Sequence, residues 1–93
     1  MRTSGLQFST RSDGFVDIGY EDYTVDIFDG MDVEVTYTLS KQDFSLLLNA
    51  LPASGKSDKA RLIDAFTADF DSDAFETFCE AHGIEFKRHV WIG

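Results

Sequence analysis

The clearest pattern in the chain is a strict alternation of apolar and polar residues along residues 33–39. Its apolar positions are Val33, Val35, Tyr37 and Leu39. Alternation with a period of two is typical of a β-strand that has one buried face and one face in water. The preceding segments can pair with this strand through tight turns, and the following segments have helical spacing. We therefore expect the rest of the chain to be arranged around it.

A first hairpin is predicted near the N-terminus. Two alternating segments, residues 6–9 and 16–20, are separated by a Ser-Asp-Gly sequence that ends at Gly14. A three-residue loop pairs Phe8 with Ile18 and keeps the apolar residues on one face, whereas a two-residue turn scatters them over both faces. We therefore expect the longer loop, with Gly14 in the left-handed conformation of a bulged turn.

A second loop of the same kind is predicted at residues 28–30, which include a second Asp-Gly pair. A three-residue loop there pairs Val25 with Val33 and Tyr23 with Val35, so that these side chains share the core face. This register predicts a strand along residues 23–27 beside the strand of residues 33–39.

The two hairpins can be joined in two ways. In the first, Glu21 and Asp22 form a two-residue turn that pairs Ile18 with Val25, which gives a four-stranded antiparallel meander. In the second, residues 15–28 form one long strand, and a bulge near residues 19–22 absorbs the change of phase. The meander is the preferred prediction.

Helical spacing of apolar residues begins after residue 39. Ser40 is a predicted N-cap with Asp43 three residues later, and this helix ends before Pro52. A second helix begins near Ser57 or Asp58, and a third covers about residues 72–82. The residues expected to face inward from the first two helices are Phe44, Leu47, Leu48, Leu51, Leu62, Ile63, Phe66 and Phe70.

The last segment is predicted to be a strand. Gly83 ends the third helix, and Ile84 can reach back to Cys79. Beyond it, Ile84, Phe86, Val90 and Ile92 alternate with Glu85, Lys87, His89 and Trp91, with Arg88 interrupting the apolar series. This strand is expected to join an edge of the meander. The predicted fold is a single α+β domain over residues 1–93, with an antiparallel β-meander of four strands, a C-terminal fifth strand and three short helices packed on one face, in the order β-β-β-β-α-α-α-β.

Composition narrows the choice of partner. The chain has 93 residues and a formal net charge of −9. Such an acidic balance argues against direct binding of DNA, RNA or anionic lipid and favours a cationic partner. No apolar run approaches the ~20 residues needed to cross a bilayer, and residues 1–10 lack the apolar segment of a secretory signal. We expect a soluble cytoplasmic protein.

The residues that most often carry chemistry give no enzymatic pattern. Cys79 has helical spacing with Phe75 and Phe78, which favours a buried apolar residue over a reactive thiol. His82 and His89 are too far apart to suggest a metal site or a triad, and His82 is expected at a helix end. No pair of acids has a recognisable acid and base arrangement. We expect no enzymatic activity, catalytic residue or cofactor.

One acidic stretch has the spacing of a calcium loop. Asp69, Asp71, Asp73 and Glu80 occupy its first, third, fifth and twelfth positions. The sixth position needs Gly for a sharp turn, but Ala74 stands there. We therefore expect these acids to cap the third helix rather than to bind metal.

The feature that suggests a function is an acidic region without any Lys or Arg, residues 12–40. It contains Asp13, Asp17, Glu21, Asp22, Asp26, Asp29, Asp32 and Glu34. In the predicted register Asp17 lies opposite Asp26, and Asp26 lies opposite Asp32, which makes a row of acids on the face away from the helices. Like charges directly opposite in a sheet are destabilising by about 0.2–1 kcal/mol each. A binding role would compensate for this repulsion.

Two aromatic residues are expected beside this row, because Phe15 and Phe28 would be neighbours on the same face. The predicted partner-binding residues are Asp17, Glu21, Asp22, Asp26, Asp29, Asp32, Glu34, Phe15 and Phe28. Carboxylates beside exposed aromatic rings suit a basic protein surface. We therefore predict a small inhibitor that occupies a nucleic-acid-binding site of a partner protein, such as a DNA-mimic or anti-CRISPR-type protein.

Three alternatives remain at this point. The chain could be an immunity protein against a basic nuclease toxin. It could be a structural or oligomerisation domain, a monomer or weak homodimer, in which Trp91, Phe15 and Phe28 are contacts between copies. The acidic face could also be only a solvated surface that resists aggregation.

Overall fold

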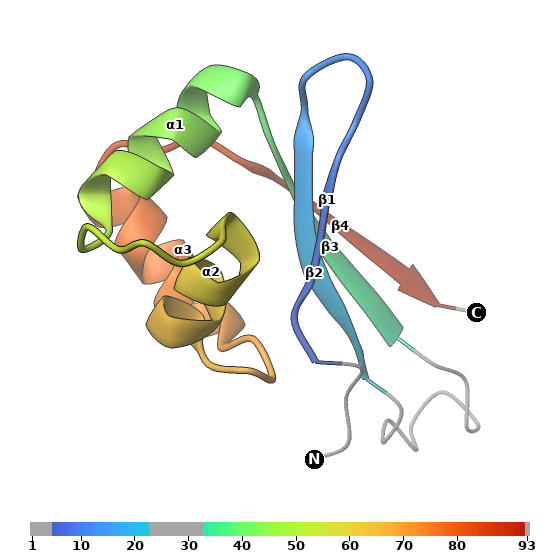
Figure 1. Ribbon diagram of the computed structural model, residues 1–93. Helices are drawn as coiled ribbons and strands as arrows, with labels where there is room; N and C mark the ends of the chain where they lie inside the picture. The colour runs from blue at the N-terminus through green and yellow to red at the C-terminus, as the bar shows by residue number, and fades with distance from the viewer. Residues whose placement is uncertain (1–4, 23–32, 93) are drawn as a thin grey trace.

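A four-stranded antiparallel sheet with three helices on one face makes up the part of the chain that the computed structural model describes, residues 5–22 and 33–92 (Figure 1). The strands are β1 (Gln7–Thr10), β2 (Val16–Asp22), β3 (Val33–Leu39) and β4 (Lys87–Ile92). The helices are α1 (Lys41–Ala50), α2 (Asp58–Phe66) and α3 (Ser72–Ala81). The predicted α+β class, with an antiparallel meander, three helices and a C-terminal strand, is confirmed.

The first hairpin has the predicted register. Phe8 lies opposite Ile18, and Arg11 and Phe15 close the loop through an amide-to-carbonyl hydrogen bond of 2.8 Å. The Gly14 amide donates to the Arg11 carbonyl at 3.0 Å, and Gly14 has φ +90°. The left-handed glycine follows a tight turn, as expected for a three-residue loop.

The connection between the two halves of the sheet differs from the prediction. Strand β2 pairs directly with β3, so that Ile18 lies opposite Tyr37 and Tyr20 lies opposite Val35. Glu21 and Asp22 are strand residues within this pairing and do not form a turn. The predicted pairing of Ile18 with Val25 is therefore wrong.

The pairs predicted for the other side of β3 are also wrong. The two sheet neighbours of Val35 are Tyr20 and Val90, and those of Val33 are Asp22 and Ile92. Strands β2 and β4 therefore occupy both sides of β3 at these residues, and the predicted pairs of Val25 with Val33 and of Tyr23 with Val35 do not form. The predicted strand at residues 23–27 and the loop at residues 28–30 lie outside the described residues.

The absence of a side chain at Gly19 allows β2 to pair directly with β3. A Cβ at this position would lie 2.0 Å from the Val35 carbonyl oxygen. Only glycine permits such a close approach of two backbones. Pairing continues without interruption from Val16 to Asp22, so the bulge considered near residues 19–22 is not present.

The predicted starts of the three helices are confirmed by their caps, whereas Phe70, predicted on the second helix, lies beyond its end at Phe66. The side chains of Ser40, Ser57 and Asp71 accept hydrogen bonds from amides three residues later, at 3.1, 3.3 and 3.0 Å. Each satisfies a donor that the first turn leaves free. Helix α3 ends with His82 as its C-cap and with the Ile84 amide donating to the Cys79 carbonyl at 2.9 Å.

The core lies between the sheet and the helices and is rich in aromatic rings. Tyr37, at its centre, packs against the rings of Phe70, Phe75 and Phe86 with centroid distances of 5.8, 4.9 and 5.2 Å. Its buried residues are Leu6, Val16, Ile18, Val35, Tyr37, Leu39, Phe44, Leu47, Leu51, Leu62, Phe66, Phe70, Phe75, Cys79 and Ile84. The helices therefore cover only the apolar face of β1, β2 and β3.

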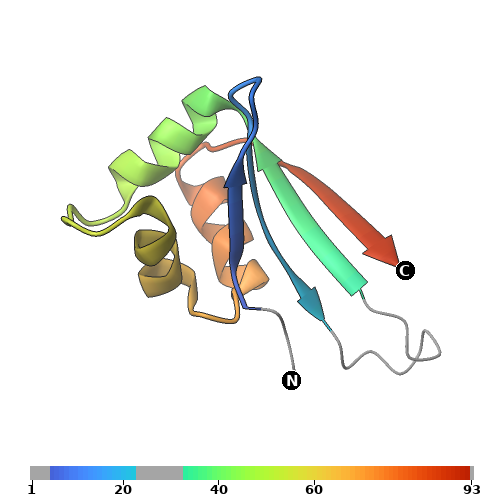
Figure 2. The same ribbon diagram turned by 45° about the vertical axis from the view of Figure 1, so that its right-hand side comes forward.

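Strand β4 joins the edge of the sheet beside β3, as predicted. Arg88 lies opposite Tyr37 and Val90 lies opposite Val35, which places both on the helix side. All six residues of β4 are nevertheless exposed. Figure 2 shows β4 at the edge of the sheet that is farthest from α1 and α2.

Candidate functional site

The face of the sheet away from the helices, here called the open face, carries three rows of side chains across the strands. One row contains Ser9, Asp17, Thr38 and Lys87, and the next contains Gln7, Gly19, Thr36 and His89. The third row contains Glu21, Glu34 and Trp91. Opposed residues of neighbouring strands point to the same side, so each row is a line of adjacent groups.

The predicted row of aspartates around Asp17 does not form. The sheet neighbours of Asp17 are Ser9 and Thr38, so Asp26 cannot lie opposite it. The Arg11 guanidinium instead donates two hydrogen bonds to the Asp17 carboxylate, at 2.8 and 2.9 Å, and the Thr38 hydroxyl donates a third at 2.7 Å. The charge of Asp17 is thus used within the protein.

These contacts set the protonation of Asp17. Partial burial by itself would raise the pKa of this carboxyl group. The hydrogen bonds from Arg11 and Thr38, with the guanidinium charge, outweigh burial and lower the pKa below its ordinary value. Asp17 is therefore a structural anion.

Two other predicted acids do lie side by side on the open face. Glu21 and Glu34 are directly opposite each other on β2 and β3. The Thr36 hydroxyl donates to a Glu34 carboxylate oxygen at 3.4 Å. Asp22 lies opposite Val33 and therefore projects to the helix side. Of the predicted acids described by the structure, only Glu21 and Glu34 lie directly opposite each other.

Trp91 completes the row formed by these two glutamates. It lies opposite Glu34, and its side chain is 61% exposed. Its indole stacks on the His89 ring, with centroids 6.2 Å apart and planes 23° apart. The alternation along the last strand placed Trp91 on the polar side, but only the pairing of β4 with β3 places it beside the glutamates.

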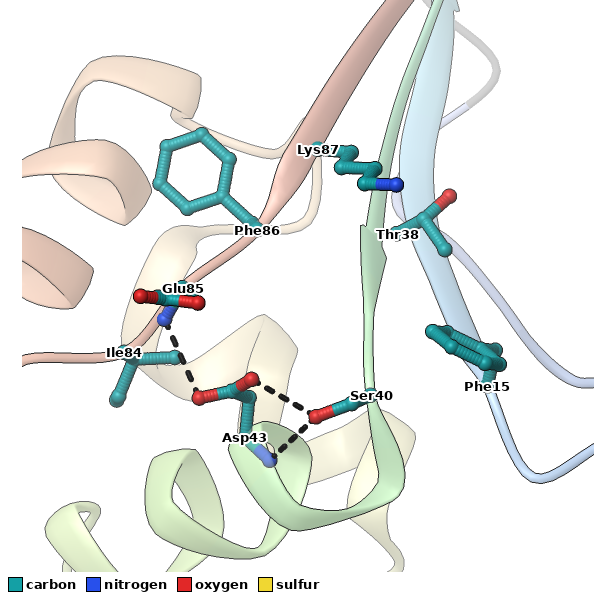
Figure 3. Close-up of a pocket in the computed structure, with 8 residues that line it drawn as sticks. All are labelled: Phe15, Thr38, Ser40, Asp43, Ile84, Glu85, Phe86 and Lys87. Atoms are coloured by element: carbon teal, nitrogen blue, oxygen red, sulfur yellow. Dashed lines mark hydrogen bonds between the residues drawn. The ribbon is translucent and has the colours of Figure 1, made fainter.

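A cleft of about 580 Å³ opens at the end of this face. It lies where β3 and the segment leading into β4 diverge (Figure 3), and it is lined by Phe15, Thr38, Ser40, Asp43, Ile84, Glu85, Phe86 and Lys87. The predicted site residue Phe15 forms one of its walls. Sequence reasoning missed this cleft because its walls are about 40 residues apart in the chain.

The Asp43 carboxylate connects the two walls of the cleft. One oxygen accepts a hydrogen bond from the Ser40 hydroxyl at 2.8 Å, and the other accepts from the Glu85 amide at 3.3 Å. The helix cap and the last strand are therefore fixed to each other. Three apolar side chains line the cleft beside these polar groups, namely Phe15, Ile84 and Phe86.

The remaining predicted site residues, Asp26, Phe28, Asp29 and Asp32, lie outside the described residues. The stretch with calcium-loop spacing, residues 69–80, is described. Asp71 caps α3, which begins at Ser72, so most of the positions that a calcium loop would occupy are helical. Within residues 5–22 and 33–92, no group of three or more His, Cys, Asp or Glu side chains is placed to hold a metal ion.

Cys79 has the environment expected of a core residue. Its side chain is fully buried, and burial together with nearby acids, Asp43 first among them, raises the pKa of the thiol to about 12. The protonated thiol is a poor nucleophile. None of the helices in the described ranges has the length and apolar character required to cross a bilayer.

No family model matches the chain, and no match was found among curated proteins or solved structures. Function must therefore be inferred from the side chains of the open face and of the cleft beside it.

Proposed function

We propose that this protein is a non-enzymatic acidic module that binds a basic surface of another protein through its open face. The observation that supports this most strongly is the row of Glu21, Glu34 and Trp91. Two carboxylates placed directly opposite are destabilising by about 0.2–1 kcal/mol. A Lys or Arg of the partner placed over both carboxylates would add a positive charge to this row.

The exposed tryptophan supports the same conclusion. Tryptophan is enriched among the residues that dominate protein interfaces, and arginine stacks well on an indole face. Trp91 therefore offers an apolar anchor next to the two carboxylates. A guanidinium group could contact the indole and Glu34 together.

Two features extend this surface to the cleft. Thr38 and Lys87 belong to the first open-face row and also line the cleft. The open face and the cleft are therefore continuous. An apolar side chain of the partner would fit against Phe15 and Phe86, and Lys87 would favour an acidic group at that end.

The net charge of −9 suggests the class of partner. Proteins that bind DNA or RNA display Lys and Arg at the spacing of phosphates. An acidic module can occupy such a groove and exclude the nucleic acid, in the manner of a DNA mimic or anti-CRISPR protein. Inhibition of a nucleic-acid-binding protein is the function we propose within this class.

The test compares two double variants that remove the same number of charges. Glu21→Gln with Glu34→Gln neutralises the open-face row. Asp58→Asn with Asp64→Asn neutralises two exposed acids of α2, a helix outside the proposed surface. Immobilised wild type and both variants are used to capture proteins from a lysate of the native host, with elution by a salt gradient. Each captured protein is then tested for nucleic-acid binding with and without the module.

The proposal expects one basic protein that is retained by wild type and by the α2 variant but lost with the open-face variant. Nucleic acid should compete for it. Trp91 is the only tryptophan in the chain, so its fluorescence should change on binding. Equal retention by all three proteins, or binding without competition by nucleic acid, would contradict the proposal.

A further inference from the structure

The two edges of the described sheet differ in length, cover and chemistry. The edge strand β1 has four residues, and its Phe8 ring packs on Phe44 of α1 with centroids 5.5 Å apart. The edge strand β4 has six residues, all exposed, and three of them are large and apolar: Val90, Trp91 and Ile92. A long exposed edge with apolar side chains is a template for another strand.

We propose that β4 pairs in antiparallel fashion with β4 of a second copy of this chain, about a two-fold axis through Val90. The inference goes beyond the proposed partner of the open face and does not rest on it. The two sheets would join into one, with all helices on one side and both open faces on the other.

Symmetry limits the possible registers. A two-fold axis that relates antiparallel edge strands is perpendicular to the sheet, so helix-side residues must oppose helix-side residues. With the axis at Val90, this residue faces Val90 of the second copy. Trp91 faces His89 of the second copy, and Ile92 faces Arg88 of the second copy. All three exposed apolar side chains of β4 are then covered.

Other registers are less favourable. An axis at His89 leaves Ile92 beyond the paired residues of β4. An axis at Arg88 opposes two guanidinium groups. An axis at Trp91 also covers the three apolar side chains, with Trp91 facing itself and Val90 facing Ile92, but it pairs only residues 90–92 of β4 with one another. The axis at Val90 covers the same side chains without opposing like charges and pairs residues 88–92.

Charge also favours this edge for contact between two acidic copies. Strand β4 contains Lys87 and Arg88 and no acidic residue. Arg88 lies 3.9 Å from the Glu76 carboxylate of its own chain, which partly balances its charge. Two β4 strands that meet therefore bring no carboxylates of their own against each other.

The test depends on symmetry, because a residue on a two-fold axis faces the same residue of the second copy. Val90→Lys and Val90→Glu each place two like charges in contact, whereas an equimolar mixture of the two variants places Lys against Glu. Leu46→Lys on α1 is the matched control, because Leu46 and Val90 are 45% and 44% exposed. Mass in solution is measured by sedimentation from about 1 µM to about 1 mM, the range that brackets weak interfaces.

The proposal expects wild type and Leu46→Lys to reach twice the mass of a single chain as concentration rises. Each Val90 variant should associate at least about tenfold more weakly, and the mixture should return to within about threefold of wild type. Circular dichroism checks that each variant is folded. A wild type that stays at single-chain mass throughout, a Val90→Lys variant that associates like wild type, or folded variants whose mixture stays monomeric would each overturn it.

Discussion

The two faces of β3 differ in what they contribute to the protein. On the helix side, Val35, Tyr37 and Leu39 are buried beneath the helices. On the open side, Glu34 and Thr36 belong to rows that no helix of the described chain covers (Figure 1). Substitutions on the helix side should therefore have the larger effect on stability, whereas substitutions of Glu34 and the residues of its row should change recognition.

The two faces also differ in how they respond to pH. Burial, reinforced by the hydrogen bond that the Tyr37 hydroxyl donates to Glu76, raises the pKa of Tyr37 to about 12, although Arg88 opposes this. On the open face the pKa of Asp17 is lowered. The helix side therefore keeps the Tyr37 hydroxyl protonated to higher pH, and the open face keeps the Asp17 carboxylate ionised to lower pH.

The largest expected difference compares two phenylalanine truncations. Phe75→Ala removes a fully buried ring that packs against Tyr37, Phe66, Phe70 and Phe86, and should destabilise the fold by about 3–5 kcal/mol. Phe15→Ala removes a ring that is 41% exposed and should cost less than about 1 kcal/mol. Urea denaturation measures both. Similar losses at the two sites would mean that Phe15 belongs to the core.

A smaller effect is expected when Tyr37 loses its hydroxyl. Tyr37→Phe removes the 2.5 Å hydrogen bond to Glu76 and should lower stability by about 1 kcal/mol at neutral pH. The folded-state pKa lies above the unfolded value of about 10. The stabilisation is therefore complete below pH about 10 and is lost as pH rises toward about 12.

Thermal denaturation between these two pH values checks the direction of this pH dependence. Wild type should lose stability steeply between these two pH values, and the loss should be shallower in Tyr37→Phe. An unchanged alkaline slope in the variant would show that another group controls it.

The smallest effect concerns the ion pair on the open face. Asp17→Asn weakens the contacts to Arg11 and Thr38 and should cost about 0.5–1 kcal/mol at neutral pH, because the pair is partly exposed. The folded-state pKa lies below the unfolded value of about 3.9, so the stabilisation is present above that value and is lost as pH falls through the folded-state pKa.

The control is Asp64→Asn, which breaks the more exposed pair with Lys56 and should cost less than about 0.5 kcal/mol. Denaturation at neutral and at acid pH separates the two variants. A difference between wild type and Asp17→Asn that persists unchanged in strong acid would contradict the assignment.

Local patterns were enough to predict the local structure. The alternation along residues 33–39 predicted β3, and the spacing of Ser40 and Asp43 predicted the start of α1. The shared apolar face of residues 6–9 and 16–20 predicted the register of the first hairpin and the left-handed conformation of Gly14. Each of these features depends on a few neighbouring residues, whose conformational preferences do not require the rest of the fold.

The parts that the sequence left undecided depend on segments distant in the chain. Several strands of similar apolar pattern could lie beside Ile18, and the choice of Tyr37 follows from packing β2 against β3 through Gly19. This choice separated Asp17 from the predicted aspartate row and gave it Arg11 as a counter-ion.

The sequence by itself determined the class of fold, the helix caps and the sides of the last strand, because turn geometry and side-chain period are local properties. Only the tertiary structure decided that Glu21, Glu34 and Trp91 form one row and that a cleft opens beside Phe15. The physical reason is that strand pairing is selected by the sum of many weak contacts across the whole core, which no single segment encodes.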